Sequence, residues 1–174
     1  PHIQTDPRNL LPVAEALAAR LARLDPAHAA DYQGRLTAFA ERLRTAIERW
    51  ERRAAPLRGV GVVVHHHGWT YLEQWLGLRE VGTLEPRPGV PPSTAHLAAL
   101  LRRLRESPAT MVIRAPFQDG RASEWLARRL HVQPVVLPFT VGGTPKAKDL
   151  FSLYEDTVDR LLAALPEAAG RQRP

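Results

Sequence analysis

The feature that most constrains the fold is an alternation of short apolar runs and helical patterns that begins at Gly59. Apolar or β-branched runs occupy residues 60–64, 80–84, 110–114 and 134–138. Amphipathic helical patterns occupy residues 69–76, 93–105, 120–130 and 148–165. Apolar strands that alternate with helices are typical of a parallel sheet covered on both faces. The chain is therefore predicted to be an α/β protein with about four parallel strands, the count following from that alternation.

The first 57 residues carry a purely helical pattern instead. Asp6 and Asp25 each precede a proline, an arrangement that predicts a capped helix start. After Asp25 the apolar residues recur every three or four positions, which predicts a helix of about 30 residues. We therefore divide the chain into a helical entry (1–57), an α/β lobe (58–166) and a polar tail (167–174).

Composition narrows the classes of partner and site. Cysteine is absent, which excludes disulfides and thiolate metal ligands. The net charge of +6 comes almost wholly from arginine, without the interleaved aromatic residues of a nucleic-acid interface, so we predict no nucleic-acid partner. No apolar run approaches the roughly 18 residues that span a bilayer.

Histidines mark the candidate site. In a parallel sheet ligands gather at the carboxyl ends of the strands, where His65, His66, His67 and Glu85 are expected to lie. Since neighbours on an extended chain point to opposite sides, at most two of the three histidines can face one cavity. A neutral imidazole at a strand end or helix entrance is a ready ligand for a divalent metal. His2 and His66 are the candidate ligands. The alternative for His66 is a strand-end histidine satisfied by local hydrogen bonds, and the alternative for His2 is a mobile surface residue.

Other candidates have plain structural alternatives. Asp149, at the start of the last helix, is either a cap or an oxygen ligand, and Asp119 has the same two readings. The loop at Gly142 and Gly143 lacks the spacing of a dinucleotide or Walker motif. Nucleophile-elbow and His-Glu-x-x-His sequences are absent, so we predict no enzyme. A stand-alone α/β enzyme acting on a phosphorylated substrate, with Lys146 beside this loop, is the alternative of a different class.

Four segments, in this order, resemble one known family. They are residues 1–9 (PHIQTDPRN), 62–72 (VVVHHHGWTYL), 85–93 (EPRPGVPPS) and 137–151 (LPFTVGGTPKAKDLF). Together they resemble the C-terminal half of the cluster A-I metal-binding proteins, the periplasmic substrate-binding proteins of zinc and manganese ABC transporters. The resemblance covers nearly the whole chain.

The resemblance implies a protein of two lobes joined by a long helix, with the metal held between them. The first ligand would come from an N-terminal lobe that this chain lacks, while His2 and His66 match the second and third. The family's final aspartate falls near Val141, which cannot ligate; Asp149 would replace it if the loop folds back, and water would otherwise fill the position. Histidine at position 66 favours Zn²⁺ over Mn²⁺, because imidazole suits Zn²⁺ and oxygen donors suit Mn²⁺.

The function implied by the resemblance is periplasmic capture of Zn²⁺ and delivery to the membrane permease of an ABC transporter. The mechanism would be binding and release, by a monomeric protein. A manganese-selective or adhesin-like member of the same fold is the alternative within the family.

Overall fold

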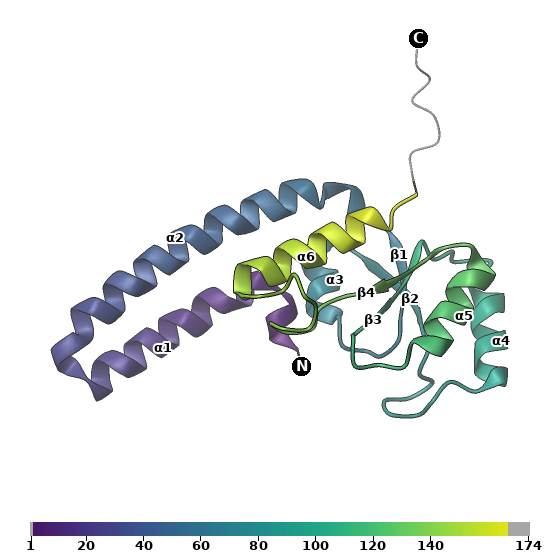
Figure 1. Cartoon of the computed structure of the whole chain (residues 1–174), viewed down its shortest axis with the longest axis horizontal. Helices are drawn as coiled ribbons and strands as arrows, with labels where there is room; N and C mark the ends of the chain where they lie inside the picture. Colours follow the sequence, from purple (N-terminus) through teal and green to yellow (C-terminus); the bar gives the residue numbers. More distant parts are fainter. Residues whose placement is uncertain (1, 167–174) are drawn as a thin grey trace, which may run out of the picture.

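The computed structural model describes residues 2–166 and contains a four-stranded, fully parallel sheet (Figure 1). The strand order is β2-β1-β3-β4. The strands are β1 (Gly61–Val64), β2 (Arg79–Thr83), β3 (Met111–Arg114) and β4 (Gln133–Val136). This confirms the predicted α/β fold class, with strand ends shifted by one or two residues from the apolar runs, as is usual for element boundaries.

Helices cover both faces of the sheet, so the strands are buried on both sides. On one face α3 (Thr70–Leu76), α6 (Leu150–Ala163) and the end of α2 (Ala29–Arg53) pack against Val62 and Val64. On the other face α4 (Thr94–Arg103) and α5 (Gly120–Leu130) pack against Val63. Successive strand residues point to opposite faces, which explains why β1 reads as a continuous apolar run.

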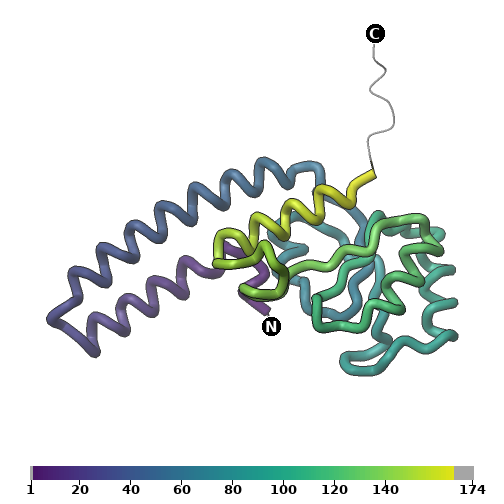
Figure 2. The backbone as a smooth tube through the Cα atoms, viewed as in Figure 1, coloured from purple at the N-terminus to yellow at the C-terminus, as the bar shows by residue number. Residues whose placement is uncertain are grey.

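A long helical hairpin projects from this lobe (Figures 1 and 2). It consists of α1 (Leu10–Leu24) and α2, which run side by side and are joined by the 3-10 turn η3 (Pro26–His28). The turns η1 (Ile3–Thr5) and η2 (Pro7–Asn9) precede the hairpin, and η4 (Ala55–Leu57) leads from it to β1. The buried residues of α2 begin only near its middle, at Ala40, whereas α1 has none, so only the base of the hairpin belongs to the core.

The expected helix start at Asp25 is wrong in detail. The Asp25 carboxylate makes no cap bond; it binds His28 Nδ1 at 2.8 Å and the Tyr32 hydroxyl at 2.9 Å instead. Because residues 26–28 form a 3-10 turn, α2 has 25 residues and not about 30. Asp6 does act as a cap, because its carboxylate accepts a hydrogen bond from the Arg8 amide. The element that it caps is the turn η2 and not α1.

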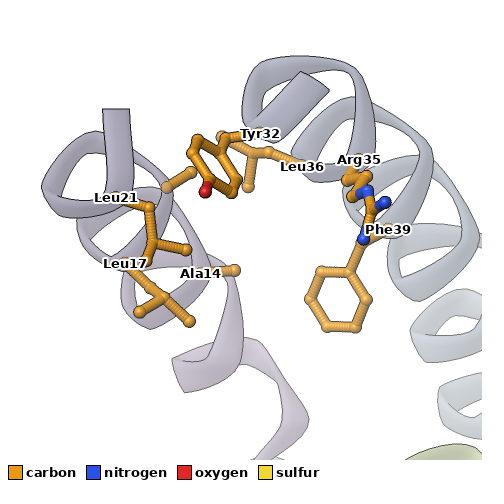
Figure 3. Close-up of a pocket in the computed structure, with 8 residues that line it drawn as sticks. Ala14, Leu17, Leu21, Tyr32, Arg35, Leu36 and Phe39 are labelled. Carbon is orange, nitrogen blue, oxygen red and sulfur yellow. The ribbon is translucent and has the colours of Figure 1, made fainter. Parts of the chain in front are cut away.

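An apolar groove of about 370 Å³ lies between the two helices of the hairpin (Figure 3). We call it the hairpin groove; its lining residues are Ala14, Leu17, Ala18, Leu21, Tyr32, Arg35, Leu36 and Phe39. Leu17 is 57% exposed, and Leu24 on the same helix is 65% exposed. Among residues 2–166, no helix is both long enough and apolar enough to cross a membrane. The predicted polar tail, residues 167–174, lies outside the described residues.

Candidate metal centre

His66 stands immediately beyond the carboxyl end of β1. The preceding amide, that of His65, still donates to the Ile113 carbonyl at 2.8 Å, so the backbone stays fixed to β3 up to this point. The Nδ1 atom of His66 lies 2.7 Å from Glu85 Oε2. Because a carboxylate only accepts hydrogen bonds, Nδ1 carries the proton and Nε2 carries the lone pair. The ring nitrogen of His66 that is free to bind a ligand is therefore Nε2.

Glu85 follows β2 at the same edge of the sheet. Its Oε2 atom also accepts a hydrogen bond from the Gly89 amide at 3.0 Å. Burial raises the pKa of Glu85, but the hydrogen bonds from His66 and Gly89 outweigh this effect and hold the pKa below its ordinary value. Glu85 is thus a carboxylate acceptor for His66, a role that the strand pattern alone did not assign.

The segment that carries His2 is held by hydrogen bonds with Thr5 and with Tyr154 of α6. Its carbonyl accepts hydrogen bonds from the Thr5 amide at 3.1 Å and the Thr5 hydroxyl at 2.9 Å. Two residues on, the Gln4 carbonyl accepts a hydrogen bond from the Tyr154 hydroxyl of α6 at 2.7 Å. The His2 ring packs edge-on against Phe139, with 4.8 Å between ring centroids. A histidine near the terminus is therefore positioned rather than free.

His2 and His66 converge at Gly68. A Cβ atom placed on Gly68 would lie 3.5 Å from His2 Cδ2, 3.6 Å from His66 Cδ2 and 3.6 Å from Phe139 Cε2. The two imidazoles thus border the same point beside a residue that has no side chain. Phe139 also packs on Trp69, at 5.0 Å between centroids, and forms an aromatic wall behind them. The structure brings together the two histidines that the sequence singled out.

His67 borders the same region; sequence reasoning placed it at this edge of the sheet but did not select it as a ligand. A depression of about 420 Å³ is lined by His2, His67, Gly68, Thr70, Tyr71 and Gln74. The Nδ1 atom of His67 lies 3.0 Å from a Glu80 oxygen, and its side chain is 56% exposed. His65 differs from both neighbours, because it is buried and its burial lowers the pKa of the imidazole.

Asp149 acts as a helix cap in the structure. Its Oδ1 atom accepts hydrogen bonds from the Ser152 amide at 2.7 Å and the Ser152 hydroxyl at 2.9 Å. The amide bond is the main reason why the pKa of Asp149 lies below its ordinary value. Asp119 likewise caps α5 through the Arg121 amide at 2.9 Å. The cap does not test the ligand role of Asp149, which stays a prediction.

The loop at Gly142 and Gly143 has its amides engaged internally. The Gly142 amide donates to the Ala147 carbonyl at 2.7 Å, and the Gly143 amide donates to the Thr140 carbonyl at 3.0 Å. Phosphate-binding loops present their amides to the anion. These bonds therefore argue against the alternative of a phosphate site here.

The described residues do not form a complete metal site by themselves. Within residues 2–166, no three histidine, aspartate or glutamate side chains are gathered closely enough to hold a metal ion. Protein-bound Zn²⁺ takes about four ligands in tetrahedral geometry. What the described residues bring to one point is a pair of imidazoles, those of His2 and His66.

The sequence model of the periplasmic zinc-uptake complex component A family, ZnuA, matches residues 1–164. The chain belongs to this family. It corresponds to a C-terminal part of a cluster A-I metal-binding protein, as the sequence motifs indicated. Members of the family are solute-binding proteins and not enzymes.

Individual relatives agree with this assignment. The high-affinity zinc uptake system protein ZnuA of Brucella abortus (strain 2308) is 26% identical over 115 residues, which cover 66% of this chain and 34% of that protein. The chain thus spans about a third of the length of this curated relative. A crystal structure of ZnuA, also 26% identical, superposes with a TM-score of 0.79 over 95% of this chain and 60% of its own.

A more distant structure shares the fold. The substrate-binding protein FpvC of Pseudomonas aeruginosa, in complex with Mn²⁺, has a TM-score of 0.75 and 21% identity. The match covers 95% of this chain and 60% of FpvC. At this identity the likeness establishes the architecture and leaves the choice of metal open.

Proposed function

We propose that this chain is the C-terminal lobe of an extracytoplasmic protein that captures Zn²⁺ and delivers it to the membrane permease of an ABC transporter. The observation that carries the proposal is the convergence of His2 and His66 at Gly68, at the carboxyl edge of the sheet. Membership of a zinc-uptake family supports zinc as the cargo. The mechanism is binding and release, which needs no reacting group.

His2 and His66 would each donate one neutral ring nitrogen to the cation. Imidazole suits Zn²⁺, whereas an all-oxygen site suits Mn²⁺, so a histidine pair supports zinc. Asp149 is the candidate oxygen ligand within the chain. It would reach the metal only by giving up hydrogen bonds to Ser152 or through its other oxygen, and a water molecule would take the position otherwise.

The remaining ligand would come from an N-terminal lobe of the same protein. The solved ZnuA chain extends well beyond the matched part, since this chain covers 60% of it. The hairpin groove is the surface that we assign to this lobe, because exposed Leu17 and half-buried Phe39 give it an apolar face next to the histidine pair's own lobe. Because both lobes would belong to the same chain, a monomer would supply the whole ligand set.

The test is calorimetric titration of Zn²⁺ into the full-length natural protein and its histidine variants. We expect His2→Ala and His66→Ala each to weaken Zn²⁺ binding by roughly tenfold or more, because each removes one of about four ligands. His28→Ala, on the exposed turn of the hairpin, is the matched control and should leave binding unchanged. His67→Ala decides whether the third nearby imidazole contributes.

Two outcomes contradict the proposal. If His66→Ala binds Zn²⁺ as tightly as the wild-type protein, His66 is not a ligand and the proposed site is wrong. Preference for Mn²⁺ in a competition titration would make the chain a manganese-selective member of the family instead. The isolated chain should bind Zn²⁺ only weakly, because it lacks part of the ligand set.

A further inference from the structure

We propose that Glu85 is the positioning residue of the metal centre: it fixes the tautomer of His66 and thereby aims Nε2 at the cation. The inference rests on the proposed function, because it deepens the role of the same site. Its starting point is the 2.7 Å contact between His66 Nδ1 and Glu85 Oε2.

The sheet itself delivers Glu85 to His66. The Glu85 amide donates to the His65 carbonyl at 3.0 Å, which prolongs the pairing of β1 and β2 by one step beyond the strands. The Thr83 hydroxyl lies 3.3 Å from the same His65 carbonyl and 3.1 Å from the Glu85 carbonyl. Two adjacent strands therefore set the positions of the carboxylate and the imidazole, and the contact does not depend on a flexible loop.

A second hydrogen bond, to the same oxygen atom, also holds the carboxylate. Gly89 has a φ of +77°, a left-handed conformation that turns the segment 86–92 back, and its amide donates to Glu85 Oε2 at 3.0 Å. The Glu85 side chain is only 15% exposed. A shielded carboxylate held by two donors cannot swing away from His66 at low cost.

Glu85 serves His66 rather than His65. The Oε1 atom lies 3.8 Å from His65 Nε2, which is too far for a hydrogen bond. A second histidine–glutamate pair lies nearby: His67 Nδ1 is 3.0 Å from a Glu80 carboxylate oxygen. That pair differs in being more exposed, since His67 is 56% exposed against 32% for His66.

The consequence concerns which nitrogen of His66 can ligate. A free neutral imidazole exchanges its proton between the two nitrogens, and only the form with the proton on Nδ1 can bind metal through Nε2. A carboxylate behind the ligand also fixes the orientation of the ring. Loss of such a partner typically weakens metal binding by about 10- to 100-fold, and we expect this range for Glu85→Ala.

The first test reads the tautomer of His66 without metal. Long-range ¹H–¹⁵N NMR on the metal-free protein, above the pH at which imidazoles protonate, reports which ring nitrogen carries the proton. We expect Nδ1–H in the wild-type protein and a mixture of both forms in Glu85→Ala. Glu85→Gln should restore Nδ1–H, because the amide oxygen can still accept. Glu80→Gln, the matched control, should leave the His66 signals unchanged.

Two results would overturn the inference. One is Nε2–H at His66 in the wild-type protein, which needs no variant and so does not depend on variant folding. The other is an unchanged His66 tautomer in a folded Glu85→Ala protein. A Zn²⁺ titration of the same samples tests the proposed function separately: absence of any Zn²⁺ effect on His66 in the wild-type protein contradicts zinc capture, whatever the tautomer.

Discussion

The helical hairpin and the α/β lobe both contain regularly placed apolar residues but bury them to very different extents. Strand β1 of the lobe is fully buried, as are the indole of Trp50 and the side chain of Leu43 where α2 enters the lobe. In α1 no residue is buried, although its apolar residues recur at regular helical spacing. Periodicity identifies the apolar face of a helix and does not reveal what covers it.

Helix α2 belongs to both regions, and the boundary runs along it. Its second half joins an aromatic cluster in which Trp50 lies 6.3 Å from Trp75 and 5.3 Å from Tyr154, measured between ring centroids. The Trp50 indole also donates to Glu155 Oε2 at 2.6 Å. The first half of α2 contacts mainly α1, so stability should be concentrated at the base of the hairpin.

The largest effect should come from truncating Trp50. Trp50→Ala empties a fully buried site and removes one of the hydrogen-bond donors to Glu155, so we expect a loss of about 3–5 kcal/mol in the free energy of unfolding. Leu17→Ala, in the exposed half of the hairpin, should change it by no more than about 0.5 kcal/mol. Urea unfolding of both variants measures the difference. Equal losses would contradict the contrast between the two regions.

A smaller effect is expected at the boundary, where Asp149 caps α6. The first turn of α6 carries Phe151, whose ring lies 3.8 Å from the Arg42 guanidinium of α2. Asp149→Ala should cost about 1 kcal/mol, because the Ser152 amide loses its acceptor. Asn can also cap, so Asp149→Asn should retain most of the stability in the same urea measurement.

The Asn variant also separates the two roles of Asp149. It keeps a cap but removes the carboxylate, so a weaker Zn²⁺ affinity in Asp149→Asn would support ligation. An unchanged Zn²⁺ affinity would show that Asp149 is not a ligand, and it would support a water molecule in that position.

The last expected effect is a pH dependence within the lobe. Burial, and then the neighbouring Glu80, raise the pKa of Glu73 to about 7. The folded protein therefore binds this proton more tightly than the unfolded chain, whose ordinary pKa is 4.5. Its stabilising contribution is complete below the ordinary value and is lost as the pH rises through about 7. Glu73→Gln should remove this decline.

The measurement is the difference in melting temperature between Glu73→Gln and wild type at about pH 5 and about pH 8, spanning the two pKa values. The difference should shift in favour of the variant at the higher pH. A pH-independent difference would show that Glu73 titrates normally.

The sequence predicted the lobe well because the same physical rule governs pattern and structure. A strand covered on both faces must be apolar where it is covered, and residues 62–64 and 111–113 are apolar without a break. The cap at Asp25 failed because a local alternative won: His28 and Tyr32 take the carboxylate. A cap motif states what a side chain can do and does not exclude competing partners.

The site was predictable to a lesser degree. Topology placed His66 at the ligand edge of the sheet, and a resemblance selected His2. Their convergence could not be derived from spacing, because it depends on Phe139 and on the bond from Tyr154 to Gln4. The sequence placed Glu85 at the carboxyl edge of the sheet. Only the structure shows that it binds His66 and not His65.

That bond between Gln4 and Tyr154 joins residues 150 positions apart in the chain. During synthesis the segment that bears His2 is made long before α6, the helix that anchors it. The anchored position of His2 therefore cannot form until α6 has been made, and a protease that removes α6 would release the segment around His2 while leaving both histidines intact.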